Sequence, residues 1–184
     1  MTLLKTDRIY TGRIVSLDID TVRYPNGTVG ELEMLRHPGA SAVLPFLDDP
    51  LDDDPRILLI RQFRHATGDY LWEIPAGRRD GTETPEATAI RELREETGYA
   101  CTTLHKLTWI WTTPGFTDEV IHLFMASGLT AGAASLEADE ILDLHTLRWS
   151  DVRAMIRDGK IVDAKSLVAL LFAETEVRES RQPR

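Results

Sequence analysis

The stretch Gly77–Tyr99, GRRDGTETPEATAIRELREETGY, decides the fold of this chain. It follows the pattern G-x5-E-x7-R-E-U-x-E-E-x-G-U, in which U is an apolar or aromatic residue. Each fixed residue type has an average usage of about 7% or less, so composition alone would produce the pattern at a given start roughly once in 10^8. We therefore treat the spacing as a motif that serves a defined chemistry.

The motif predicts a loop followed by a helix. Thr84 and Pro85 are the residue types preferred at an N-cap and at the first helical position. Gly98 stands where a residue in the left-handed conformation commonly ends a helix. The loop is therefore expected at 77–83, with the helix after it.

Three carboxylates are predicted to share one face of this helix, because Glu95 and Glu96 follow Glu92 at helical spacing. The apolar residues expected to pack on a sheet are Ala89, Ile90 and Leu93. An exposed helix with ion pairs would explain neither the glycines nor Glu83 at its fixed distance. Clustered carboxylates repel one another unless a cation neutralises them.

Mg²⁺ or Mn²⁺ fits such a cluster best, since both are hard ions that prefer oxygen ligands. Metal ions held there can activate water and offset the charge that develops on a phosphoryl group. The motif therefore indicates hydrolysis of a pyrophosphate linkage.

A chain of 184 residues is long enough for one globular domain, or for one domain with an extra element. The net charge of −9 argues against a general affinity for nucleic acid or anionic membranes. Cys101 is the only cysteine, so no intramolecular disulfide can form. The sequence has neither a signal peptide nor an apolar run of membrane-spanning length, and we expect a cytoplasmic protein.

The chain before the motif begins with a predicted β-hairpin. Alternating residues of its first strand are Val15, Leu17, Ile19 and Thr21. Asn26-Gly27 is a strong hairpin turn signal, and Leu32 and Met34 belong to the return strand. A break at His37-Pro38-Gly39 predicts a β element at 1–38.

The main domain is expected at 39–175, followed by a flexible tail at 176–184. Its predicted strands are Ala42–Leu47, Arg56–Phe63, Leu71–Ile74, Leu107–Thr112, Val120–Ala126 and Leu142–Trp149. Its predicted helices after the motif are Ser150–Arg157 and Asp163–Thr175. Strands flanked by helices indicate an α/β sandwich.

The motif resembles the Nudix box at every signature position, and the resemblance extends over most of the chain. It implies an α/β/α sandwich with a mixed sheet that hydrolyses a nucleoside diphosphate linked to another moiety. It also implies two to three Mg²⁺ (or Mn²⁺) ions. The ligands that it assigns are the Ala76 carbonyl oxygen and the side chains of Glu92, Glu95 and Glu96. Residues implied to shape the loop are Gly77, Glu83 and Arg91.

Three features resemble the ADP-ribose pyrophosphatase branch of that family. Pro114 lies sixteen residues beyond Gly98, and the segments Arg61–Arg64 and Trp72–Gly77 are similar to segments of that branch. The third feature is the N-terminal antiparallel β element, which resembles the one through which those enzymes form homodimers. The implied substrate is a small nucleotide sugar.

By the same similarity, Arg64 would contact a substrate phosphate and Glu119 the sugar or the metal shell. The aromatic side chains that could stack on the nucleobase are Trp72, Phe116 and Tyr24. A glutamate of a loop after the core strands would orient or activate the water. Both Glu137 and Glu140 are candidates, and the spacing of Glu140 fits better.

The sequence thus predicts hydrolysis of ADP-ribose to AMP and ribose 5-phosphate. A hydrolase of GDP-mannose or of many nucleotide sugars is an alternative, because the ending GKIVDAKSLVALL is similar to both. A sensor that binds nucleotide sugars without cleaving them, and an enzyme that removes oxidised triphosphates, are further alternatives.

Overall fold

The structure of the protein is a computed structural model that describes residues 1–134 and 141–178. The chain divides into two compact units. Unit 1 comprises Met1–Gly39 and Trp111–Ile121, and unit 2 comprises Ala40–Ile110 and His122–Arg184. No helix within the described part is long and apolar enough to cross a membrane.

Unit 1 is built on a three-stranded antiparallel sheet in the order β1-β2-β3. Its strands are β1 (Thr2–Thr11), β2 (Ser16–Arg23) and β3 (Val29–Arg36). Asn26-Gly27 joins β2 to β3 as predicted, with Gly27 at a φ of 87°. The Asn26 side chain accepts the Thr28 N–H at 3.1 Å, which holds the turn.

Strand β1 was not predicted from the sequence. Almost all side chains of this strand are exposed, and its apolar residues do not alternate with polar ones. A strand that buries neither face leaves no periodicity in the sequence. Its pairing with β2 is therefore visible only in the structure.

The segment Trp111–Ile121 joins unit 1 through the end of β3. The Leu35 N–H donates to the Phe116 carbonyl oxygen at 2.8 Å, and the Asp118 N–H donates to the Leu35 carbonyl oxygen at 3.2 Å. The Asp118 carboxylate accepts the His37 N–H at 2.8 Å. These bonds fix the loop that carries Phe116.

Unit 2 contains a four-stranded mixed sheet, in the order β7-β4-β9-β8, and a three-stranded antiparallel sheet, in the order β10-β5-β6. Its strands are β4 (Ala40–Pro45), β5 (Arg56–Arg64), β6 (Asp69–Glu73), β7 (Ala76–Arg78), β8 (Tyr99–Trp111), β9 (Val120–Ala131) and β10 (Leu142–Arg148). Its helices are α1 (Pro85–Thr97), α2 (Trp149–Arg157) and α3 (Ala164–Phe172), with a π-helical turn η1 (Ala173–Arg178) after α3.

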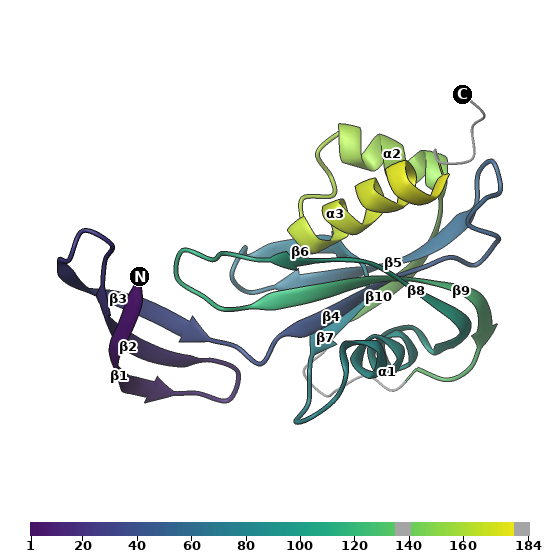
Figure 1. Cartoon of the computed structure of the whole chain (residues 1–184). Coiled ribbons are helices and arrows are strands. Elements are labelled where there is room, and N and C mark those ends of the chain that lie inside the picture. Colours follow the sequence, from purple (N-terminus) through teal and green to yellow (C-terminus); the bar gives the residue numbers. More distant parts are fainter. Residues whose placement is uncertain (135–140, 179–184) are drawn as a thin grey trace. The chain divides into compact units, whose positions relative to one another are not determined.

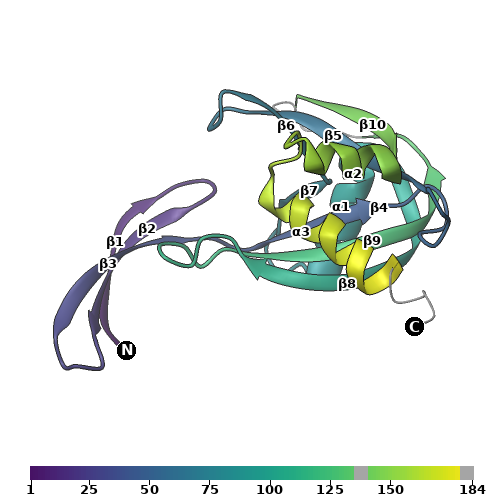
Figure 2. The same cartoon turned by 90° about the horizontal axis from the view of Figure 1, so that it is seen from above.

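The helices of unit 2 cover both sides of its strands. In Figure 1, α1 lies on one side, and α2 and α3 lie on the other. Figure 2 shows α2 and α3 side by side over the strands. This arrangement confirms the predicted α/β/α sandwich. The helix expected at Asp163–Thr175 is shorter than predicted, because α3 ends at Phe172 and the chain continues as a π-helical turn.

The core between the mixed sheet and α1 consists of Val43, Ala89, Leu93, Phe124 and Ala126. All of these side chains are almost completely buried. Full burial of a side chain such as Leu93 contributes about 1.5–3 kcal/mol to the stability of the folded state. This packing fixes the orientation of α1, and with it the direction in which the other faces of the helix point.

Candidate active site

Helix α1 begins and ends where the motif predicts. Thr84 is the N-cap, and its hydroxyl accepts the Ala87 N–H at 3.2 Å. Pro85 is the first helical residue. Gly98 has a φ of 76°, and its N–H donates to the Arg94 carbonyl oxygen at 2.9 Å. Only a residue tolerant of the left-handed region ends a helix this way at little cost.

The carboxylates of α1 differ in exposure. Glu92 and Glu96 are nearly buried, at 6% and 3% exposure, whereas Glu95 is partly exposed. The prediction that Ile90 packs on the sheet with Ala89 is wrong, because Ile90 is exposed. Successive helical residues are about 100° apart, so Ile90 points away from the sheet when Ala89 faces it.

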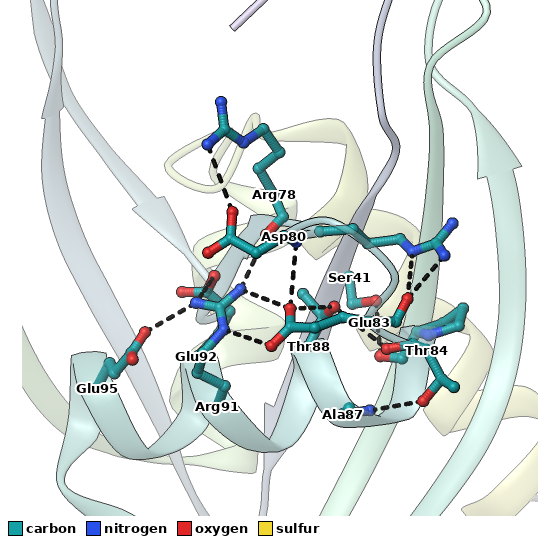
Figure 3. A network of polar contacts seen from close by, with 12 residues as sticks. Ser41, Arg78, Asp80, Glu83, Thr84, Ala87, Thr88, Arg91, Glu92 and Glu95 are labelled. Carbon is teal, nitrogen blue, oxygen red and sulfur yellow. Dashed lines mark hydrogen bonds and ion pairs between the residues drawn. The ribbon is translucent and has the colours of Figure 1, made fainter. Parts of the chain in front are cut away.

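Arg91 is the hub of the polar network in Figure 3. Its Nε donates to Glu83 Oε1 at 3.0 Å, and its Nη1 donates to Glu92 Oε1 at 2.6 Å and to Glu95 Oε2 at 2.8 Å. Its Nη2 donates to the carbonyl oxygen of Arg78 at 2.9 Å. One guanidinium therefore joins the loop to the carboxylates of the helix, and its hydrogen bond to Glu83 is the main cause of its raised pKa.

Glu83 closes the loop before α1. Its Oε2 accepts the Thr88 hydroxyl at 3.0 Å and the Asp80 N–H at 3.2 Å. Its carbonyl oxygen accepts two hydrogen bonds from the Arg79 guanidinium. Hydrogen bonds from Arg91 are the main cause that lowers the pKa of Glu83 to about 2. The loop therefore holds Glu83 as a carboxylate.

Two backbone features set the positions of the buried carboxylates. A Cβ at Gly77 would lie 1.9 Å from Glu92 Oε1, so only glycine leaves room for this carboxylate. The Ala76 N–H donates to Glu96 Oε2 at 3.0 Å. β7 thus contacts both Glu92 and Glu96, which explains why the motif begins with a glycine.

The donor set fits a hard divalent cation. Glu92, Glu95 and Glu96 all offer carboxylate oxygens, and uncompensated charge on the two nearly buried residues would be costly. Within the described part of the chain, no three His, Cys, Asp or Glu side chains are already arranged as a metal site. In this structure Arg91 neutralises Glu92 and Glu95. The Ala76 carbonyl oxygen lies in the same segment of β7 and could add a ligand.

Arg64 lies at the end of β5. Its Nε and Nη2 donate to Glu73 Oε1 and Oε2 at 2.7 and 2.8 Å, a bidentate pair. Glu73 is 1% exposed, whereas the Arg64 side chain is 40% exposed. Arg64 therefore has a buried partner on β6 and a partly exposed side chain.

The chain matches one family model. The model of the NUDIX domain covers residues 36–170. The chain belongs to the Nudix family. The resemblance of Gly77–Tyr99 to the Nudix box is thereby confirmed, and with it the assignment of the chain as a Nudix hydrolase.

Two relatives resemble this Nudix chain over most of its length. The methanol dehydrogenase activator of Bacillus methanolicus is 38% identical, over 94% of this chain and 92% of the relative. The ADP-ribose pyrophosphatase of Bacillus subtilis (strain 168) is 35% identical, over 91% and 89%. A solved structure, described as an ADP compounds hydrolase, superposes with a TM-score of 0.79 at 23% identity, covering 99% of this chain and 96% of that chain. This last likeness supports the Nudix fold alone.

The predicted substrate residues of the Nudix site divide between the two units. Arg64 and Trp72 belong to unit 2, and Tyr24, Phe116 and Glu119 belong to unit 1. The contact with substrate assigned to each of them remains a prediction.

Three of these residues have local contacts that limit their freedom. The Trp72 ring packs edge-on against His145, with centroids 4.7 Å apart. Tyr24 lies against Gly30, where a Cβ would be 2.8 Å from its ring. Glu119 Oε2 accepts the Thr112 hydroxyl at 2.8 Å. Phe116 is exposed and is therefore the most accessible aromatic ring of the set.

Several predictions fall on residues outside the described part of the chain. Glu137 and Glu140, the candidates for the water-activating base, lie there. So do 179–184 of the predicted tail 176–184.

The contacts of Lys165, at the start of α3, were not predicted from the sequence. Lys165 Nζ contacts Glu73 Oε2, and it lies 3.1 Å from Asp163 Oδ1. Lys165 and Glu73 are 92 residues apart, so no local spacing indicates this pair. Asp163, where the sequence predicted this helix to begin, is its N-cap.

Proposed function

We propose that the chain hydrolyses the pyrophosphate bond of a nucleoside diphosphate sugar, with ADP-ribose cleaved to AMP and ribose 5-phosphate. The observation that carries this proposal is the face of α1 with Glu92, Glu95 and Glu96, two of them nearly buried beside β7. The 35% identity to a protein named ADP-ribose pyrophosphatase supports the choice of substrate.

Two to three Mg²⁺ or Mn²⁺ ions, when bound, would act as Lewis acids and lower the pKa of a bound water. Glu92, Glu95 and Glu96 would hold them, with the Ala76 carbonyl oxygen as a further ligand. The loop would be held, and the carboxylates oriented, by Gly77, Glu83 and Arg91. Glu140, or alternatively Glu137, would orient or deprotonate the attacking water.

Five further residues are assigned to substrate recognition. Arg64 would bind a phosphate through its guanidinium, and Glu119 would contact the sugar or the metal shell. Trp72, Phe116 and Tyr24 would offer aromatic faces to the nucleobase.

Relative turnover of ADP-ribose, GDP-mannose and UDP-glucose in Mg²⁺ tests the substrate. We expect ADP-ribose to give the highest kcat/KM. A hydrolase of GDP-mannose or of many nucleotide sugars is the alternative, favoured by the ending GKIVDAKSLVALL. GDP-mannose as the best substrate, or equal turnover of all three, would support it.

We also propose a cytoplasmic homodimer formed through the N-terminal β element, 1–38, with the catalytic domain at 39–175. Large apolar side chains of β1 are exposed, among them Leu3, Ile9 and Tyr10. An exposed edge strand with apolar side chains is a favourable surface for pairing with a second chain. Light scattering tests this state, and a monomer at micromolar concentration would reject it.

Activation of a dehydrogenase is a second candidate function, favoured by the 38% identity to a methanol dehydrogenase activator. Turnover of a purified methanol dehydrogenase, measured with and without this chain, tests it. Unchanged turnover rejects it.

A sensor of nucleotide sugars without hydrolytic activity is a further alternative to the proposed hydrolase. Such a protein would bind ADP-ribose tightly and leave it intact in both Mg²⁺ and Mn²⁺.

A further inference from the structure

Four charged residues of unit 2 form a cluster that we call the α3 clamp: Arg64, Glu73, Asp163 and Lys165. Glu73 is its centre, because Arg64 binds both of its carboxylate oxygens and Lys165 contacts Oε2. Lys165 also lies 3.1 Å from Asp163 Oδ1. The clamp therefore joins β5, β6 and the start of α3.

Stability alone is a poor explanation of this clamp. Glu73 and Lys165 are both nearly buried, and the cluster holds two positive and two negative charges. Burial raises the pKa of Glu73, but the Arg64 hydrogen bonds and the Lys165 charge outweigh it, so the pKa lies below its ordinary value. The cost of desolvating Glu73 and Lys165 offsets much of the attraction between them, and apolar side chains of similar volume often stabilise a fold as well.

The clamp fixes the orientation of the Arg64 guanidinium. Glu73 occupies Nε and Nη2, which is one edge of the planar group. Among the described residues, Nη1 of Arg64 has no hydrogen-bond partner, and the side chain is partly exposed. The remaining N–H donors are therefore held in one direction, as an anion-binding arginine requires.

The same clamp reaches the segment that leads into the Nudix box. Ser166 Oγ accepts the Ile74 N–H at 2.9 Å and donates to Asp163 Oδ2 at 2.6 Å. Two residues later, the Ala76 N–H donates to Glu96. The segment after Glu73 is thus bonded to α3 at one end and to α1 at the other.

We propose that Glu73 is a positioning residue, which aims the Arg64 guanidinium at the diphosphate of the substrate and ties α3 to the segment before the box. This inference rests on the proposed function, because it requires Arg64 to contact a phosphate of ADP-ribose. Glu73 itself need not touch the substrate. Its effect on substrate binding passes through Arg64.

The chain contains a matched control at the other end of β5. Arg56 donates from Nε and Nη2 to Asp48 at 2.9 and 2.7 Å, which is the same bidentate geometry. Asp48 is more exposed than Glu73, and no proposed site residue contacts this pair. Asp48→Asn therefore removes an equivalent ion pair without touching the α3 clamp.

Steady-state kinetics on ADP-ribose with saturating Mg²⁺ tests the inference. We expect Glu73→Gln to raise KM about tenfold with a smaller change in kcat, because a misdirected guanidinium loses roughly one charged hydrogen bond. Asp48→Asn should leave KM unchanged. Glu73→Asp keeps the charge but shortens the reach, so it provides a second variant if Glu73→Gln does not fold.

A double-mutant cycle with Arg64→Met separates positioning from general damage. If Glu73 acts through Arg64, adding Glu73→Gln to Arg64→Met should raise KM no further. If the effects of Glu73→Gln and Arg64→Met on KM are additive, the inference is wrong. It is also wrong if both Glu73 variants have an unchanged KM. In either case the proposed function stands as long as the wild type hydrolyses ADP-ribose. Wild-type protein that cleaves none of the tested nucleotide sugars would overturn the proposed function, and this inference with it.

Discussion

Two arginines, Arg36 in unit 1 and Arg91 in unit 2, each bind three carboxylates. The partners of Arg36 are Asp18, Asp20 and Asp118. The partners of Arg91 are Glu83, Glu92 and Glu95. In both clusters the carboxylates raise the pKa of the arginine. A cluster of carboxylates around a cation therefore does not by itself mark an active site.

The origin of the carboxylates distinguishes the two clusters. Arg36 joins two residues of β2 to Asp118, which lies 82 residues further along the chain. Arg91 joins the helix to the loop directly before it, and the helical spacing also brings Glu96 to the same face. We infer that the Arg36 cluster supports the fold of unit 1, whereas the α1 carboxylates serve catalysis.

Glu96→Gln should have the largest effect. The substitution keeps the volume but removes the charge from a nearly buried, proposed metal ligand, so we expect kcat on ADP-ribose to fall about 10^3-fold or more with the fold intact. Glu86→Gln is the matched control, since Glu86 is an exposed residue of the first turn of the same helix. Near-normal turnover of Glu96→Gln in saturating Mg²⁺ would remove Glu96 from the metal site.

Gly77→Ala should have the next largest effect. The new Cβ would overlap the Glu92 carboxylate and displace it, so we expect kcat/KM to fall on the order of 100-fold. Raising the Mg²⁺ concentration should restore part of the loss if the displaced group is a metal ligand. An active variant with unchanged Mg²⁺ dependence would show that the position of Glu92 is not critical.

Arg36→Met tests the structural side of the comparison. Asp18 and Asp20 are only 3% and 7% exposed, and the substitution removes the Arg36 ion pair of each, while Arg8 still pairs with Asp18. We expect the melting temperature to fall by roughly 5 °C or more, and further than in Arg91→Met, where only one of three carboxylates is nearly buried. Differential scanning calorimetry of both variants shows which substitution lowers the melting temperature more. A larger loss in Arg91→Met would reverse our assignment of roles.

The pH dependence of stability gives the smallest expected effect. The pKa of Glu83 is about 2 in the folded protein and ordinarily about 4.5, so the charged form is favoured by folding. Its stabilisation is complete above about pH 4.5 and is lost as pH falls through about 2. The difference in melting temperature between wild type and Glu83→Gln should therefore shrink between about pH 5 and pH 3. A constant difference over that range would contradict a depressed pKa.

Local signals predicted most of unit 2 and the candidate site. Thr84 and Gly98 fixed the ends of α1, and the three-and-four spacing fixed its acidic face, because both depend on neighbouring residues only. Strands flanked by helices predicted an α/β sandwich, and the resemblance to the Nudix family implied the α/β/α arrangement. These features need no knowledge of the rest of the chain.

Features that depend on distant residues could not be predicted. β1 has no periodicity, and the Lys165–Glu73 contact joins residues 92 positions apart. In each case the partner is selected by packing, which only the folded chain reveals.

A ³¹P NMR time course of ADP-ribose with the wild-type protein and Mg²⁺ tests the central claim most directly. We predict that the diphosphate resonances disappear and that two phosphomonoester resonances, those of AMP and ribose 5-phosphate, replace them. Added EDTA, which chelates Mg²⁺, should stop the loss of the diphosphate resonances. Unaltered diphosphate resonances in both Mg²⁺ and Mn²⁺, with ADP-ribose bound, would contradict hydrolysis at the α1 carboxylates.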